Sequence, residues 1–387
     1  MSDLASAPHE TSPADYQQLL TQALDGVTAC APATAVWRAL GAAGALGLLY
    51  GSSNTLGPVA DPARLGTLLR AVDARGDNGT TLSVLVQAAS ALPILGSGRS
   101  GRPGAAPSPV VAAFGQALAG TAQVALAATD EAAAGSDLSG LGTEVRIEGD
   151  ELVVDGGKRW VTNAGTAEYL LVLGRHHPGR HFTNFSWVLV PAETAGVTVT
   201  PATSHLLANS ATGHIAFDSV RLPADHRVGR NGRGMAVFAR HMSTERLAGA
   251  QWAVALTSRV LADTRERLLQ RTVDGEPLWH NAAVRQGFAE CLVRVAQLRA
   301  LCDSLAETAV KGQNLSAGAV LKSAVGLTVD TVLARCAQLQ GADGFSANGA
   351  QVIRAEAGVL GIGGGVTELM LAGVADMSEQ LLAELRA

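Results

Sequence analysis

Residues 157–163 of this chain read Gly-Lys-Arg-Trp-Val-Thr-Asn and lie among short runs of β-forming residues. Trp160 and Thr162 are two positions apart, and alternate side chains of a β-strand lie on the same face of the sheet. We therefore expect the indole ring and the hydroxyl group to point the same way from one strand. Such a face offers a flat apolar wall together with a hydrogen-bonding group.

The sequence on either side predicts helices before and after a β region. From Val145 to Pro223, short β-type runs are separated by turn residues. Apolar residues recur at helical spacing before this region, from about Asp15 to Leu95, and a run of small and turn-forming residues at 96–109 predicts a flexible loop. After Gly234, helical spacing predicts four long stretches: Met235–Arg271, Ala282–Val310, Ala319–Gln340 and Thr367–Leu385.

This order of elements predicts an α+β protein with three domains. We expect an N-terminal helical domain at residues 1–119, a middle β domain at 120–230 and a C-terminal four-helix bundle at 231–387. With 47% hydrophobic and 16% charged residues, the chain has enough apolar side chain to require a substantial core.

Charge and cysteine usage exclude several classes of function. The 29 basic residues are outnumbered by 34 acidic ones, so nucleic acid is not expected as a partner. The four cysteines lie far apart with no CxxC pair, which predicts reduced thiols and no metal site. The first twenty residues lack a signal pattern, and no stretch has 18 to 20 uninterrupted apolar residues. We therefore expect a cytoplasmic protein without a membrane span.

Four motifs stand in order along the chain. They are Thr-Asp-Glu-Ala-Ala-Ala-Gly-Ser-Asp at 129–137, the stretch at 157–163, Phe-Asp-Ser-Val-Arg-Leu-Pro at 217–223, which leads into Ser-Thr-Glu-Arg at 243–246, and Gln-Leu-Gln-Gly-Ala-Asp-Gly-Phe at 338–345. In this order and spacing, the chain resembles the acyl-CoA dehydrogenase flavoprotein superfamily from about residue 115 to 385. One such motif would be weak evidence, but four in order are specific.

The resemblance implies FAD as the cofactor. It places Trp160 beside the flavin ring, the Thr162 hydroxyl on the ring nitrogen that takes the hydride, and Gly135 and Ser136 at the pyrophosphate, where a glycine permits close approach. Asp130 stands where most members have a Thr beside the flavin pyrimidine. An ionised Asp130 there would repel the anionic reduced flavin, so either it is protonated or turned away, or Thr129 takes the role.

The resemblance also implies shared cofactor sites between subunits. Arg271, Gln338 and Gly341 match residues that reach the FAD of the neighbouring subunit, which implies a homodimer or homotetramer. The substrate implied is a thioester of coenzyme A or of an acyl carrier protein. The electron acceptor implied is electron-transfer flavoprotein or another acceptor.

The chain departs from the family at the catalytic base. In many members a Glu before the last helix takes the α proton of the thioester, and here Gly364 occupies that position. Other members carry the base early in the helix after the β domain, which corresponds to Glu245. Phe238, Met242 and Trp252 lie on the same helical face as Glu245, so this carboxylate is expected on an apolar stripe. The alternatives are a pair with His241 or a structural ion pair with an arginine elsewhere.

The prediction is an FAD-dependent dehydrogenase that oxidises an acyl thioester to the unsaturated thioester in specialised metabolism, with Glu245 as the base. Two alternatives remain open. One is a flavin-dependent monooxygenase or N-oxygenase on the same scaffold, which needs no base for an α proton. The other is a non-catalytic homologue that binds an acyl carrier protein, which would contain no FAD.

Overall fold

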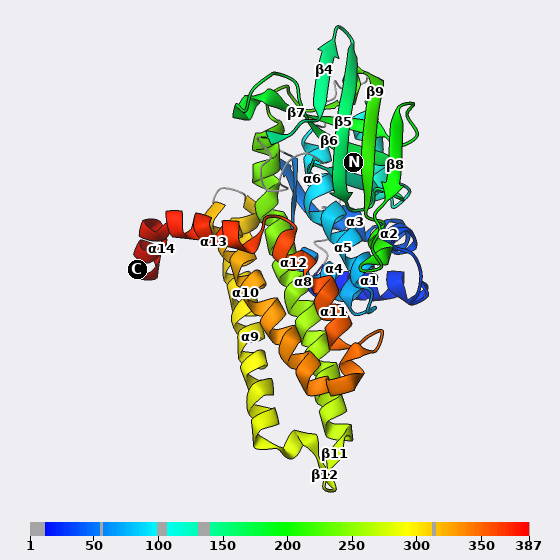
Figure 1. Cartoon of the computed structure of the whole chain (residues 1–387). Helices are drawn as coiled ribbons and strands as arrows, with labels where there is room; N and C mark the ends of the chain where they lie inside the picture. Colours follow the sequence, from blue (N-terminus) through cyan, green and yellow to red (C-terminus); the bar gives the residue numbers. More distant parts are fainter. Residues whose placement is uncertain (1–11, 55–56, 99–106, 131–139, 312–314, 387) are drawn as a thin grey trace, which may run out of the picture.

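The computed structural model of the chain describes residues 12–54, 57–98, 107–130, 140–311 and 315–386. Its N-terminal part is helical, with one short hairpin (Figure 1). The predicted loop at 96–109 falls mostly on residues 99–106, which lie outside the described residues. The elements are α1 (Pro13–Asp25), α2 (Ala33–Ala42), α3 (Ala45–Leu48), β1 (Tyr50–Asn54), β2 (Gly57–Ala60), α4 (Pro62–Asp73), α5 (Asn78–Val86), the π-helical turn η1 (Gln87–Ala91), α6 (Leu92–Ser97) and α7 (Pro109–Leu118).

Helical spacing correctly predicted the buried face of α4. Asp61 caps this helix by accepting a hydrogen bond from the backbone N–H of Arg64, and Pro62 occupies the first turn, where its missing N–H costs nothing. The apolar residues that recur at i, i+3 and i+4 are fully buried in the core: Leu65, Leu68, Leu69 and Val72.

The middle part is an eight-stranded sheet whose order is β10-β7-β6-β4-β5-β9-β8, with β3 paired to β6. Strand β6 is buried on both faces, and its alternate residues enter two different cores. Leu170 and Val172 pack into the sheet's own core, whereas Leu171 and Leu173 join the core shared with the helices. The strands are β3 (Val124–Ala127), β4 (Glu144–Glu148), β5 (Glu151–Val161), β6 (Tyr169–Arg175), β7 (Phe185–Pro191), β8 (Val197–Pro201), β9 (Gly213–Pro223) and β10 (Arg227–Val228).

Three long antiparallel helices form the body of the C-terminal part (Figure 1). Helix α8 (Gly234–Gln270) begins against the sheet, where the Trp187 indole N–H donates to the carbonyl of Gly234 over 2.9 Å. It has 37 residues, so it extends roughly 54 Å away from the sheet at about 1.5 Å per residue. A hairpin of β11 (Thr272–Val273) and β12 (Glu276–Pro277) leads into α9 (Ala282–Lys311), and α10 (Leu315–Gln340) follows.

The last predicted helix, Thr367–Leu385, is wrong as a single element. The chain instead forms α13 (Thr367–Asp376) and α14 (Ser378–Arg386), with a break at Met377. Neither helix has a buried residue, so no continuous packed face holds the two in line. Figure 1 shows α13 crossing the end of α10 and α14 projecting beyond the body, whereas α11 (Ala350–Ala357) and α12 (Val359–Ile362) lie along the long helices.

Within the part of the chain that the structure describes, three helical stretches are long and apolar enough to cross a membrane, so the prediction of no membrane span is not confirmed. Their packing differs widely. The most apolar part of Asn78–Ser97 is 89% buried inside the protein, that of Leu315–Phe345 is 56% buried, and that of Ala350–Asp376 is only 11% buried.

Candidate active site

Glu245 lies on α8 where this helix passes the π-helical turn η1. Its carboxylate oxygen Oε2 accepts a hydrogen bond from the hydroxyl of Ser90, a fully buried residue on η1. Met242 and Trp252 on the same helix are buried, as the predicted apolar stripe requires. Glu245 itself is half-buried. Among the described residues it forms no direct ion pair with an arginine, which disfavours the structural ion pair that the sequence left open.

Burial raises the pKa of Glu245 above its usual value. Three neighbours act in the opposite direction: first the Ser90 hydrogen bond, then the charges of Arg246 and Lys322. Lys322 is buried on α10, and desolvation lowers its pKa to about 8 although Glu245 partly offsets this. The site therefore combines a carboxylate whose pKa is raised by burial with two cations that partly offset that rise.

Gly364 lies directly opposite Glu245. A Cβ atom added at Gly364 would lie 3.3 Å from Oε1 of Glu245 and 3.8 Å from the sulfur of Met242. Gly364 and the following Gly365 have φ angles of +72° and +115°, a region in which side chains are strained. The Arg246 Nε donates to the carbonyl of Gly364 over 3.0 Å and so holds this segment against α8. The two alternative positions of the family's base thus converge on one place.

Trp160 and Thr162 do not share a regular strand, contrary to the prediction. The register of β5 shifts between Lys158 and Val161, the strand ends at Val161, and Trp160 has a φ of +57°. The bulge turns the Trp160 indole outward, where it is 64% exposed. The His214 ring lies perpendicular to the indole, with a centroid distance of 4.9 Å and an interplanar angle of 85°.

Thr129 lies beside the same end of β5, because the backbone N–H of Arg159 donates to its carbonyl over 3.1 Å. Thr129 and Thr162 are both half-buried. Sequence-distant candidates for cofactor contact are therefore brought together around the exposed indole of Trp160. Gly135 and Ser136, predicted for the pyrophosphate, lie outside the described residues.

Asp130 is turned into the β domain and does not line this surface. Its carboxylate pairs with the buried Lys158 ammonium and accepts hydrogen bonds from the backbone N–H groups of Gly142 and Thr143, and from the Thr143 hydroxyl. Lys158 also donates to the carbonyls of Ala128 and Leu173. The prediction of Asp130 as a cofactor ligand is therefore wrong, because these bonds already occupy its oxygens. Of the alternatives weighed from the sequence, the turned-away carboxylate is the correct one.

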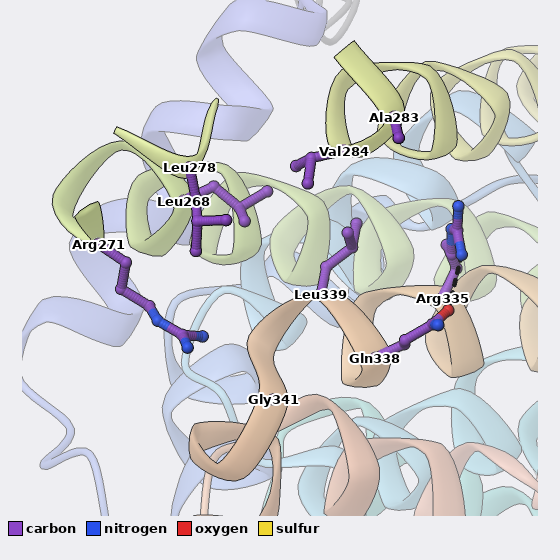
Figure 2. A pocket seen from close by; sticks show the side chains of 9 residues that line it. All are labelled: Leu268, Arg271, Leu278, Ala283, Val284, Arg335, Gln338, Leu339 and Gly341. Atoms are coloured by element: carbon purple, nitrogen blue, oxygen red, sulfur yellow. Dashed lines mark hydrogen bonds between the residues drawn. The ribbon is translucent and has the colours of Figure 1, made fainter. Parts of the chain in front are cut away.

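Arg271, Gln338 and Gly341 line one pocket at the far end of α8, as Figure 2 shows. The open volume of this pocket is about 350 Å³. The Arg271 Nη1 donates to the carbonyl of Gln340 over 2.9 Å, and a Cβ added at Gly341 would lie 3.4 Å from the same nitrogen. Arg335 also lines the pocket and donates to Oε1 of Gln338 over 2.6 Å. The first three residues thus lie together, as the motifs predict, whereas no motif indicated Arg335.

Ser90, Arg246 and Lys322 also act on Glu245, and no sequence pattern assigned them this role. Arg246 follows Glu245 in the quoted motif, but the motif does not indicate that Arg246 contacts Gly364 or lowers the pKa of Glu245. Ser90 and Glu245 are 155 positions apart, and no local pattern connects them. Ser90 sits in a long apolar helical run, where a single serine is unremarkable in sequence.

Two regions of the chain match known family models. Residues 125–220 match the acyl-CoA dehydrogenase middle domain, and residues 232–378 match the acyl-CoA dehydrogenase C-terminal domain. The chain belongs to the acyl-CoA dehydrogenase superfamily. Both matched regions carry parts of the site: the first contains Trp160, and the second contains Glu245, Arg271 and Gly364.

Individual members of the acyl-CoA dehydrogenase superfamily are only distantly similar. The probable acyl-CoA dehydrogenase FadE2 of Mycobacterium tuberculosis is 30% identical over 51% of this chain and 50% of its own length. The acyl-CoA dehydrogenase AFT10-1 of Alternaria alternata is 28% identical over 58% of this chain and 54% of its own. The chain thus spans about half the length of these curated relatives.

Solved structures share the fold over nearly the whole chain. A probable acyl-CoA dehydrogenase from Mycobacterium abscessus superposes with a TM-score of 0.82 at 22% identity, covering 95% of this chain and 99% of its own. A glutaryl-CoA dehydrogenase from Mycobacterium smegmatis, solved in complex with FADH2, gives 0.80 at 19% identity, with 94% and 93% covered. At these identities the likeness shows the acyl-CoA dehydrogenase fold alone.

Proposed function

We propose that this protein is an FAD-dependent dehydrogenase that oxidises an acyl thioester to the α,β-unsaturated thioester. The observation that carries the proposal is the half-buried Glu245 carboxylate, which faces the space left by Gly364. A base for an α proton needs a raised pKa and an open side toward the substrate. Glu245 has both.

The residues at the end of β5 fit a flavin. The exposed indole of Trp160, with the His214 ring perpendicular to it, offers a flat apolar surface, and Thr129 and Thr162 lie at the same end of β5. The Arg271 pocket supplies a guanidinium beside a glycine, which suits a phosphate group that must come close to the backbone. FAD, when bound, would accept the hydride that leaves the β carbon.

In this proposal, residues of the chain itself remove the α proton of the thioester. Glu245 takes the α proton through a carboxylate oxygen and becomes a neutral acid, while the C–H electron pair forms the new double bond and the β carbon loses hydride. Met242 and the surrounding apolar side chains exclude water, which keeps the carboxylate basic. Arg246 and Lys322 limit this effect by stabilising the ionised form.

The substrate carrier and the partners belong to the same proposal. Gly364 and Gly365 place no side chain of their own against α8, and we extend the proposal to a shifted or unusual acyl chain and a role in specialised metabolism. The thioester is carried by coenzyme A or by an acyl carrier protein, and electrons leave to electron-transfer flavoprotein or another acceptor. We further propose a homodimer or homotetramer in which Arg271, Gln338 and Gly341 contact the FAD of a neighbouring subunit.

The deciding experiment replaces Glu245 with Gln, which preserves the side chain's size but removes the proton acceptor. FAD should remain bound, and anaerobic flavin reduction by acyl thioesters should fall by a factor of about 10² to 10⁴. Glu368→Gln, which removes an exposed carboxylate from the first turn of α13, is the matched control. If the flavin of Glu245→Gln is reduced by the thioester at the wild-type rate, the proposal is refuted and a monooxygenase is favoured. Protein purified without FAD would favour a non-catalytic carrier-binding homologue.

A further inference from the structure

Ser90 occupies an unusual backbone position. The helix that runs from α5 to α6 changes to π-helical hydrogen bonding over Gln87–Ala91, and Ser90 lies inside this turn. A π-turn inserts an extra residue and redirects the side chains around it. Serines inside helices commonly bond to a carbonyl of the preceding turn. The Ser90 hydroxyl instead donates to Oε2 of Glu245 on another helix.

The π-turn is held in place from a second side. The backbone N–H of Val124, at the start of β3, donates to Oε1 of Gln87 over 3.1 Å. Both Gln87 and Ser90 are fully buried. The turn therefore links the strand that leads to Thr129 with the carboxylate of Glu245, and it has little freedom to move its serine.

Charged groups approach Glu245 from two helices, but neither bonds to it directly. Arg246 on α8 donates to the carbonyl of Gly364, and the Lys322 ammonium on α10 donates to the carbonyl of Leu360. The segment containing Gly364 faces Glu245 without a charged side chain of its own. Among the described residues, Ser90 is thus the direct hydrogen-bond donor to the carboxylate.

The two oxygens of Glu245 consequently have different surroundings. Oε2 is held by the Ser90 hydroxyl, whereas Oε1 faces the space where a Gly364 Cβ would stand, at 3.3 Å. We propose that Ser90 is a positioning residue, whose hydroxyl holds Oε2 so that Oε1 is the oxygen that receives the substrate's α proton. This inference rests on the proposed function, because it assumes that Glu245 is the base.

The hydrogen bond from Ser90 also affects the pKa of Glu245. A donor to the ionised carboxylate stabilises that form and lowers its pKa, so the loss of the donor raises the pKa. With a higher pKa, a smaller fraction of Glu245 is ionised and able to accept a proton at neutral pH. Ser90 would therefore act on both the orientation and the protonation of the base.

The test compares Ser90→Ala with Ser90→Thr, which restores a hydroxyl. Ser323→Ala is the matched control, because it removes a buried hydroxyl that has no hydrogen-bond partner among the described residues. Infrared spectra are recorded as a function of pH, and the spectrum of Glu245→Gln is subtracted to isolate the Glu245 carboxyl. This measures the protonation of Glu245 without any turnover. The FAD-loaded variants are also mixed anaerobically with an acyl-CoA series, and the pH dependence of flavin reduction is recorded.

For Ser90→Ala, we expect the carboxyl titration to move up by about one pH unit, as the loss of a hydrogen bond to a charged group implies. Flavin reduction at neutral pH should fall about tenfold, with its pH profile moved in the same direction. Ser90→Thr should recover most of both properties, and Ser323→Ala should match the wild type.

Two results would overturn the role of Ser90: a carboxyl titration unchanged in Ser90→Ala, or a shifted titration with an unchanged rate of flavin reduction. Failure of the proposed function itself gives a different result, namely wild-type flavin reduction in Glu245→Gln. Thermal unfolding of each variant separates a loss of folding from these outcomes.

Discussion

Oε1 of Glu245 on α8 and the α carbon of Gly364 before α13 face each other across the site, so that a side chain at Gly364 would begin 3.3 Å from the carboxylate. Two acids cannot occupy this space together, since they would clash and repel. The pair explains how a family with two possible positions for its base can use either. Because the two positions are adjacent, a carboxylate could be moved from residue 245 to residue 364 by substitution.

Moving the base from α8 to the loop should therefore restore part of the activity. We expect Glu245→Ala to lose flavin reduction, and Glu245→Ala with Gly364→Glu to recover a measurable fraction of it. Recovery should be incomplete, because φ is +72° at Gly364 and a non-glycine residue there costs about 1–2 kcal/mol. Glu245→Ala with Gly364→Ala is the control for backbone strain. Equal rates of flavin reduction in the two double variants would refute the exchange.

The charge of Lys322 should set the pH profile of the reaction. Lys322 lowers the pKa of Glu245, so its neutral replacement Lys322→Gln should raise that pKa. The base acts only when ionised, and the rate rises as pH increases through this pKa. The rising limb should therefore move to higher pH in Lys322→Gln, as measured by anaerobic flavin reduction from pH 5 to 9. A limb that stays in place would show that Lys322 does not act on Glu245.

Trp160 should contribute directly to cofactor retention. Its exposed indole is the apolar wall at the end of β5, so Trp160→Ala should weaken FAD binding by roughly tenfold or more, as the loss of an aromatic contact implies. Equilibrium dialysis with released flavin measures this, with about one FAD per subunit expected for the wild type. Phe182→Ala removes another exposed aromatic ring, on the turn before β7, and should leave binding unchanged. Equal FAD affinity in both variants would contradict this assignment.

The buried Asp130–Lys158 pair should be a stability element. Lys158→Met leaves the Asp130 carboxylate buried without its counter-charge, and breaking such a pair typically costs about 3–5 kcal/mol. Denaturant unfolding should show this loss. Arg221→Ala breaks an exposed pair with Glu151 and should cost less than about 1 kcal/mol. A Lys158→Met variant as stable as Arg221→Ala would disprove the structural role.

Shared cofactor sites can be tested by mixing defective subunits. If Trp160 of one chain and Arg271 of another complete one site, then Trp160→Ala and Arg271→Ala dimers should each bind FAD weakly. Hybrids contain one intact site, so refolding an equal mixture should restore about a quarter of all sites in a random dimer. Light scattering gives the oligomeric state. A monomer with full FAD occupancy, or no recovery on mixing, would exclude shared sites.

The spacing of residues along the sequence was sufficient to predict much of the secondary structure and its buried faces. Leu65 and Leu68 were correctly predicted on one buried face of a helix, and Glu245 on an apolar stripe, because residues three or four positions apart must share a helical face. The ordered motifs indicated the superfamily, and they correctly placed Arg271, Gln338 and Gly341 near one another.

Local spacing failed where the backbone was irregular or the contact was remote. Because β5 has a bulge, Trp160 and Thr162 do not follow the alternation of side chains in a regular strand. The direction of the Asp130 side chain depends on Lys158, which is 28 positions away. The meeting of Ser90 with Glu245, and of Gly364 with the same carboxylate, exists only because helices packed together place them there. Periodicity determines which face of an element is apolar, but only the packing of whole elements determines which side chains meet across the interface.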